Sequence, residues 1–274
     1  MELGIFFDHV LEAAKQENCT IIEVLQHAAS NGIKNLTIDS AYWMQHDREI
    51  DQLLMQSGMT IHSTFAHADL AHDHEMEKAE SVIRFAADHG VEHVLLIPGF
   101  VKEGEERQVI IERIAKHLGE LVQTANRQSV ICSLEDFDHV DATFGTWSEL
   151  KHYASEVAGL AITFDTGNFA YFGQDALTAL DELLVYVKSV HCKDRSFTQL
   201  RGEEGLGCPD GRRLFPCAVG EGHIPFEPMM RKLVASGYDG NLTIEHYDCN
   251  HQYQAMADSA AYLNNLLHML KGED

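Results

Sequence analysis

Four apolar segments in the second half of the chain each end at a residue that can bind a divalent metal. The segments are Ile131–Glu135, Ala161–Asp165, Ser189–His191 and Leu242–Glu245. In a parallel β/α protein the carboxyl ends of the strands all open onto one face, so three carboxylates and one imidazole would converge there. The pattern predicts a metal site, and therefore an enzyme.

The spacing and chemistry of these candidate ligands narrow the prediction. Glu135, Asp165, His191 and Glu245 are separated by 30, 26 and 54 residues. The first two gaps each fit one βα unit, and the third fits one unit plus a long loop, which places the ligands on consecutive strands. This oxygen-rich set is typical of Mn²⁺ or Mg²⁺ and is compatible with Co²⁺ or catalytic Zn²⁺. We expect one divalent ion, with Mn²⁺ as the first choice. Each acid taken alone could instead cap a helix, but capping does not explain four residues in register.

The elements that must position these residues alternate along the whole chain. Short β-rich segments are separated by stretches with apolar residues three or four apart. The predicted strands are Leu3–Phe7, Leu36–Asp39, Thr60–Ser63, His93–Ile97, Val130–Glu135, Ala161–Asp165, Val187–His191 and Asn241–His246. The predicted helices are Ile21–Ser30, Arg48–Ser57, Glu77–His89, Glu106–Arg127, Trp147–Val157, Ala176–Tyr186, Phe226–Ala235 and Gln252–Leu270.

Eight strands and eight helices with short connections predict a (β/α)8 TIM barrel. Gly32, Gly58, Gly90, Gly159 and Gly237 each follow a helical pattern and precede a strand, where a left-handed helix cap belongs. No linker divides the chain, so we expect a single domain over residues 1–274. A doubly wound open sheet is the alternative, because periodicity does not show closure.

The composition indicates a soluble protein that avoids polyanions. The chain has 20 Lys and Arg against 43 Asp and Glu, a net charge of −23. This charge disfavours nucleic acid and anionic membrane surfaces as partners. No apolar stretch reaches 18 residues, Met1–Val10 has the pattern of a strand rather than a leader, and the six cysteines are scattered as expected for reduced thiols. We expect a cytoplasmic protein.

The segment Arg195–Ile224 interrupts the regular alternation. Long connections in compact domains are usually functional or disordered. Arg201, Arg212 and Arg213 lie in it and could bind a phosphate, although solvated loop charges are the simpler interpretation.

Histidines are concentrated in another part of the chain, after the third predicted strand. His62, His67, His72 and His74 match no metal-ligand motif and predict a polar loop over the site.

Several segments together resemble a known family. They are Leu134–Asp136, Phe164–Asn168, Val190–Asp194, Gly220–Phe226, Gly237–Gly240 and Leu242–Glu245, all in the C-terminal half. This set resembles the sugar phosphate isomerase/epimerase family with the xylose isomerase-like barrel, to which ketose 3-epimerases and an AP endonuclease branch are related. The resemblance implies that two metal-bound glutamates, Glu135 and Glu245 by position, exchange a proton on a substrate carbon while the metal polarises its oxygens.

Three further residues are candidates for substrate binding. His62 closes the third predicted strand and could hydrogen-bond a substrate oxygen, or it could be structural. Asn168 lies three residues past Asp165, where several epimerases of the family carry a substrate-binding His. Arg195, four residues past His191, could bind a hydroxyl, carboxylate or phosphate group.

The leading functional hypothesis is a metal-dependent isomerase or epimerase. Its substrate would be a small sugar, sugar phosphate or keto-polyol. The alternative is a dehydratase of the inosose or dehydroshikimate type, which begins with the same proton abstraction. A nuclease of the AP endonuclease type needs a surface that accepts DNA, which the net charge of −23 disfavours. A barrel that keeps the site only as a ligand sensor is the non-enzymatic alternative. The resemblance also implies that a homo-oligomer can form, since many relatives pair through the faces of their barrels.

Overall fold

Eight parallel strands form a closed barrel in a computed structural model that describes residues 1–71 and 75–272. Strand β1 pairs with both β2 and β10, and β10 also pairs with β7, so the sheet has no open edge around the barrel. The predicted (β/α)8 fold is confirmed, and the open sheet is excluded. The barrel strands are β1 (Glu2–Phe6), β2 (Ile33–Asp39), β3 (Thr60–His67), β4 (His93–Ile97), β5 (Ile131–Glu135), β6 (Ala161–Asp165), β7 (Val187–Ser196) and β10 (Asn241–Glu245).

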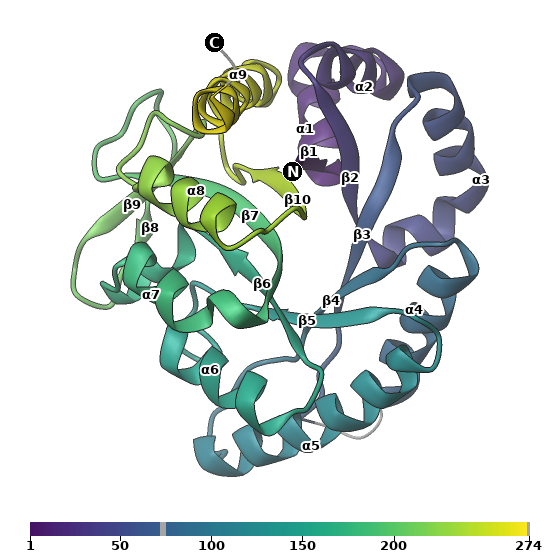
Figure 1. The fold of residues 1–274 in the computed structure, drawn as a ribbon, viewed down its shortest axis with the longest axis vertical. Coiled ribbons are helices and arrows are strands. Elements are labelled where there is room, and N and C mark those ends of the chain that lie inside the picture. The colour runs from purple at the N-terminus through teal and green to yellow at the C-terminus, as the bar shows by residue number, and fades with distance from the viewer. Residues whose placement is uncertain (72–74, 273–274) are drawn as a thin grey trace.

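The helices surround the barrel and bury one face each against it (Figure 1). The five glycines predicted to end helices all have left-handed φ angles, between 71° and 89°. The helices are α1 (Phe7–Glu17), α2 (Ile21–Ser30), α3 (Ser40–Ser57), α4 (Met76–Asp88), α5 (Arg107–Asn126), α6 (Trp147–Glu156), α7 (Ala176–Leu183), α8 (Phe226–Ala235) and α9 (Gln252–Lys271), with short 3-10 turns at Asn168–Phe172 and Leu184–Tyr186.

The N-terminal elements differ from the prediction. The first strand ends at Phe6, one residue before its predicted end, and it is followed at once by α1, a helix that was not predicted and that buries Phe7 and Val10. The apolar residues at the start of the chain have the pattern of one continuous strand. The sequence therefore does not show where the two-residue period of the strand changes to the 3.6-residue period of the helix. Helix α3 begins at Ser40 instead of Arg48, because Asp39 caps it and a kink at His46 joins two helical pieces.

Two strands extend beyond their predicted ends. Strand β3 continues to His67 and β7 continues to Ser196, whereas the apolar patterns end at Ser63 and His191. In both strands the added residues include polar side chains, which the hydrophobic pattern does not register. His72 and His74 lie outside the described residues.

The segment after Arg195 is ordered by a small antiparallel sheet. Strand β9 (Arg213–Cys217) pairs with the end of β7, and β8 (Leu206–Gly207) pairs with β9. Asp194 then accepts hydrogen bonds from the backbone amides of Gly220, Gly222 and Ile224 at 2.9, 3.0 and 3.1 Å. This segment therefore lies fixed against the barrel mouth on the side of β7.

Polar side chains form a layer inside the barrel. Thr37 bonds Ser63 at 2.8 Å, and Ser133 bonds both Thr163 at 2.7 Å and the imidazole of His93 at 2.8 Å. Each of these groups is buried, so the hydrogen bonds between strands offset the cost of removing them from water.

None of the helices among the described residues has the length and apolar character needed to span a membrane.

Candidate metal centre

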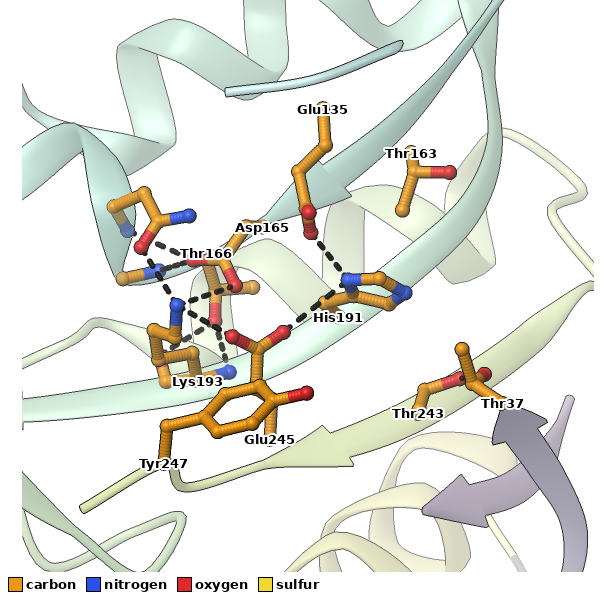
Figure 2. Close-up of polar contacts among 12 residues, drawn as sticks. Thr37, Glu135, Thr163, Asp165, Thr166, His191, Lys193, Thr243, Glu245 and Tyr247 are labelled. Atoms are coloured by element: carbon orange, nitrogen blue, oxygen red, sulfur yellow. Dashed lines mark hydrogen bonds and ion pairs between the residues drawn. The ribbon is translucent and has the colours of Figure 1, made fainter. Parts of the chain in front are cut away.

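Four residues from consecutive barrel strands converge at the carboxyl end of the barrel. Glu135 ends β5, Asp165 ends β6, His191 lies on β7 and Glu245 ends β10. One potential ligand atom from each lies within 4.8 Å of the others, and all four side chains are buried (Figure 2). The parallel sheet brings these residues together, because all its strands run in the same direction.

The carboxylate of Asp165 is held in a fixed orientation. Its Oδ1 accepts hydrogen bonds from the backbone amides of Gly167 and Asn168 at 2.7 and 2.8 Å. Its Oδ2 is buried and accepts no hydrogen bond. A buried carboxylate oxygen without a hydrogen bond is costly unless a cation lies beside it. The ammonium of Lys193 lies 3.6 Å from Oδ2 without a hydrogen bond to it, and the surrounding donors, three carboxylates and one imidazole, are a set that fits a divalent ion.

His191 lies between two of the carboxylates. Its Nδ1 contacts an oxygen of Glu135 and lies 3.2 Å from Oε2 of Glu245. Burial lowers the pKa of His191, but the charges and hydrogen bonds of Glu135 and Glu245 outweigh it and raise the pKa to about 10. The surrounding negative charge thus favours a cation at this position.

The two glutamates have pKa values that move in opposite directions. Burial is the main cause that raises the pKa of Glu135. Burial also acts on Glu245, but Lys193 and His191 outweigh it and hold the pKa of Glu245 below its usual value. A pair of carboxyl groups whose environments separate their pKa values is typical of acid–base sites.

Lys193 is a residue of the site that sequence analysis did not single out. Its Nζ lies 2.5 Å from Glu245 Oε1 and 3.6 Å from Asp165 Oδ2 (Figure 2). It also donates to Oδ1 of Asn168 at 2.8 Å. Burial lowers the pKa of Lys193, yet Asp165 and Glu245 raise it further, so the ammonium stays charged. The signal in the sequence is its position two residues after His191, which puts both side chains on one face of a strand.

The three predicted substrate-binding residues have different positions. Asn168 and Arg195 line a cavity of about 670 Å³ above the four-residue cluster. His62 is not among the lining residues, because β3 continues past it and presents His67 at the cavity instead. The expectation that the third strand ends near His62 is wrong.

The cavity has further polar residues that the sequence analysis did not single out. Asp8 follows β1, and its Oδ2 accepts a hydrogen bond from the hydroxyl of Tyr247 at 2.7 Å. Asp39 caps α3, and Asp138 accepts a hydrogen bond from Arg195 at 2.6 Å. Asp39 is the last residue of β2, and Asp8 and Asp138 lie two and three residues past the ends of β1 and β5, so the strand-end pattern that predicted the ligands applies to them as well.

Comparison with known proteins places this barrel in a family. The sequence pattern that defines the xylose isomerase-like TIM barrel family matches residues 11–266. The chain belongs to this family. The resemblance to the xylose isomerase-like barrel is therefore confirmed over both halves of the chain, including the first half, where diagnostic motifs are few.

Individual proteins similar to this chain match it over a short segment or at low identity. An inosose dehydratase of Clostridium perfringens is 34% identical over 87 residues, which is 31% of this chain and 29% of the relative. A D-tagatose 3-epimerase-like protein superposes with a TM-score of 0.75 at 19% identity, covering 100% of this chain and 99% of the other. The IolI protein with a bound zinc atom superposes with a TM-score of 0.75 at 15% identity, covering 98% and 99%. At these identities the two structural likenesses show the fold.

Proposed function

We propose that this protein is a divalent-metal-dependent isomerase or epimerase of a small carbohydrate. It would act by moving a proton at a carbon next to a carbonyl group. The observation that carries the proposal is the convergence of Glu135 and Glu245 with Asp165 and His191 at the bottom of a cavity large enough for a sugar. Glu135, Asp165, His191 and Glu245 would hold the ion, with Mn²⁺ as our first choice.

The carboxylates would carry the proton transfer. A proton next to a carbonyl is weakly acidic, and a bound divalent ion stabilises the negative charge that develops on the carbonyl oxygen. Glu135 and Glu245 both line the cavity, so one carboxylate would remove a proton from the substrate carbon and the other would return it.

Residues around the two glutamates would orient the substrate. Lys193 places its ammonium beside Glu245 at the cavity, and Asn168 holds it there by accepting from Nζ at 2.8 Å while its own amide donates to the carbonyl of Asp136. The ammonium would orient a substrate oxygen while the carbon faces the carboxylates. Phe6, Phe65 and Tyr247 cover other parts of the cavity and limit access of water.

A dehydratase of the inosose type is the second candidate, supported by two observations. The matched segment of the inosose dehydratase is 34% identical to this chain, whereas the D-tagatose 3-epimerase-like protein is 19% identical. In addition, the ammonium of Lys193 lies beside Glu245. Removal of the α-proton by a carboxylate would be followed by departure of a hydroxyl group, to which a cationic donor can give a hydrogen bond.

The decisive experiment is proton exchange in deuterated water with Mn²⁺-loaded protein and a set of ketoses and keto-inositols. We expect deuterium to enter at the carbon next to the carbonyl, and Glu245→Gln to reduce the rate about 10²–10⁴-fold. Product analysis separates the candidates, because an epimer or isomer keeps its oxygen atoms and a dehydratase product lacks one water.

A matched control removes the charge of a glutamate that lies far from the site. Glu92 is exposed and precedes β4, at the opposite end of the barrel, so Glu92→Gln should leave the rate unchanged. Exchange that proceeds equally fast in Glu245→Gln and in Glu92→Gln would contradict the proposed function.

A further inference from the structure

The charges that line the cavity bear on the class of substrate. Six carboxylates face it, from Asp8, Asp39, Glu135, Asp138, Glu245 and Asp248. Two cations, Lys193 and Arg195, face it as well. Proteins bind phosphate and carboxylate groups with arginine or lysine side chains whose charge is available to the ligand. The question is whether either cation is available.

Both cations already have carboxylate partners. Lys193 lies 2.5 Å from Glu245 and 3.6 Å from Asp165, and Arg195 lies 2.6 Å from Asp138. Both side chains are buried, so neither can turn away to meet an anion without leaving a carboxylate unpaired in a poorly hydrated place.

The arginines of the segment after β7 do not supply the missing charge. Arg201 is paired with Glu221, Arg212 lies 2.6 Å from Asp210, and Arg213 donates to the carbonyl of Gly205. None of the three lines the cavity. The prediction that they could bind a phosphate therefore has no support in their positions.

The remaining charges also disfavour an anion. A divalent ion held by Glu135, Asp165 and Glu245 would have its charge balanced by three carboxylates. Burial lowers the pKa of His67, so this imidazole is mainly neutral at neutral pH. Among the residues that the structure describes, every lysine and arginine at the cavity is thus matched by an acid, and Asp8, Asp39 and Asp248 remain as additional negative charge.

The uncharged parts of the lining suit a polyhydroxylated compound. Phe6, Phe65, Phe137 and Tyr247 offer ring surfaces to carbon-bound hydrogens of a sugar or cyclitol. The carboxylates are hydrogen-bond acceptors only, and hydroxyl groups are the matching donors. For example, one oxygen of Asp39 accepts from the amide of Tyr42 at 2.8 Å, while its side chain stays at the cavity.

We propose that the cavity selects an uncharged polyhydroxy ketone and rejects phosphorylated or carboxylated sugars. The inference rests on the proposed function, since it assigns the substrate class of the same site. It favours free ketoses and keto-inositols as substrates. Among dehydratases it favours the inosose type over the dehydroshikimate type, whose substrate carries a carboxylate.

The test measures binding without turnover. Inositol and a linear hexitol lack the carbonyl and cannot react, so calorimetric titration of the Mn²⁺-loaded protein reports affinity alone. Each is compared with its own monophosphate. We expect the phosphorylated compound to bind at least about 100-fold more weakly, because like charges brought together in a cavity oppose binding. Equal or tighter binding of the monophosphates would overturn the inference.

A variant tests the physical cause. Asp138→Asn removes the charged partner of Arg195. It should reduce the difference in affinity between inositol and its monophosphate at least about tenfold, because the guanidinium becomes available to the phosphate. The matched control is Asp141→Asn, because Asp141 lies on the same connection but is exposed and outside the cavity lining. It should leave the difference in affinity unchanged. A difference in affinity that stays the same in Asp138→Asn would overturn the assigned cause.

The binding experiment and the exchange experiment fail separately. If Mn²⁺-loaded protein prefers the uncharged polyols but exchanges no proton with any ketone, the charge preference stands and the proposed function is contradicted. If exchange occurs with phosphorylated ketoses at kcat/KM values equal to those of free ketoses, the proposed function stands and the charge preference is contradicted.

Discussion

One buried residue, His93, makes the stability of the barrel depend on pH. Its imidazole is buried at the start of β4 and bonded to Ser133. Burial, followed by the nearby imidazoles of His62 and His191, lowers the pKa of His93 to about 3. In an unfolded chain the pKa of a histidine is about 6.5. Between these values the unfolded chain binds more protons than the folded one, so the free energy of unfolding falls as the pH falls.

We therefore predict acid destabilisation of about 1 kcal/mol per pH unit from this group between roughly pH 6 and pH 4. His93→Gln should unfold with a smaller pH dependence, whatever its stability at pH 7. Urea unfolding at pH 7, 6 and 5 measures the slope. His152 is exposed on α6, so His152→Gln should retain the original slope. An unchanged slope in His93→Gln would rule out this residue as the cause.

At the residue scale, the sequence indicated what the strand ends carry but not what lies beyond them. Glu135, Asp165 and Glu245 each end an apolar run, which made them visible. Lys193 and Arg195 lie on the part of β7 past the apolar pattern, and their partners Glu245 and Asp138 are distant in the chain. Such pairings depend on barrel closure, which local patterns do not contain.

At the scale of elements, one carboxylate organises the connection between β9 and α8. Asp194 is buried at the end of β7 and accepts four backbone hydrogen bonds, from Arg195, Gly220, Gly222 and Ile224. A side chain at Gly222 would collide with it, since a Cβ there would lie 2.2 Å from Asp194 Oδ1. The segment Gly220–Phe226, noted in the sequence for its resemblance to the family, is therefore held by an acid that precedes it in the chain.

We predict that Asp194→Asn lowers the free energy of unfolding by about 1–3 kcal/mol, because an amide nitrogen cannot accept and leaves buried backbone amides unpaired. Urea unfolding measures the loss, and hydrogen exchange at Gly220–Ile224 should accelerate. Asp51 is exposed on α3, and Asp51→Asn should change stability by no more than about 0.5 kcal/mol. Equal effects of the two substitutions would contradict the role assigned to Asp194.

Most strands and helices were visible in the sequence because each has a buried face with regular spacing. The exceptions have physical reasons. Helix α1 follows β1 without a break, and no side chain caps its first turn. Strands β8 and β9 are short and partly exposed, and they are held by strand pairing, β9 with β7 and β8 with β9, rather than by an apolar face.

At the scale of the whole molecule, the four-residue cluster links ligand binding to stability. Three buried carboxylates lie within 4.8 Å of one another, and the positive charges of Lys193 and His191 beside them offset only part of their repulsion. Because the ligands come from four strands, a bound ion would connect half of the barrel. An ion that binds only the folded state stabilises it by about 2.7 kcal/mol at a concentration 100 times its Kd.

We predict that Mn²⁺ at such a concentration raises the Tm by roughly 5–10 °C. Asp165→Asn, which keeps Oδ1 for the amides of Gly167 and Asn168 but loses the charge, should lose most of this shift. The shift in Tm is measured by differential scanning calorimetry of chelator-treated protein with and without Mn²⁺. A shift of the same size in Asp165→Asn would place the stabilising ion elsewhere.

The seam between β10 and β1 also sets an order of events during synthesis. Residues at opposite ends of the chain meet there, and α9 packs over it against α1 and α2. On the ribosome, the first seven barrel strands emerge before Glu245 exists. The growing polypeptide can form most of the barrel wall early, yet the proposed ion site would lack one of its four residues until the last strand has left the exit tunnel.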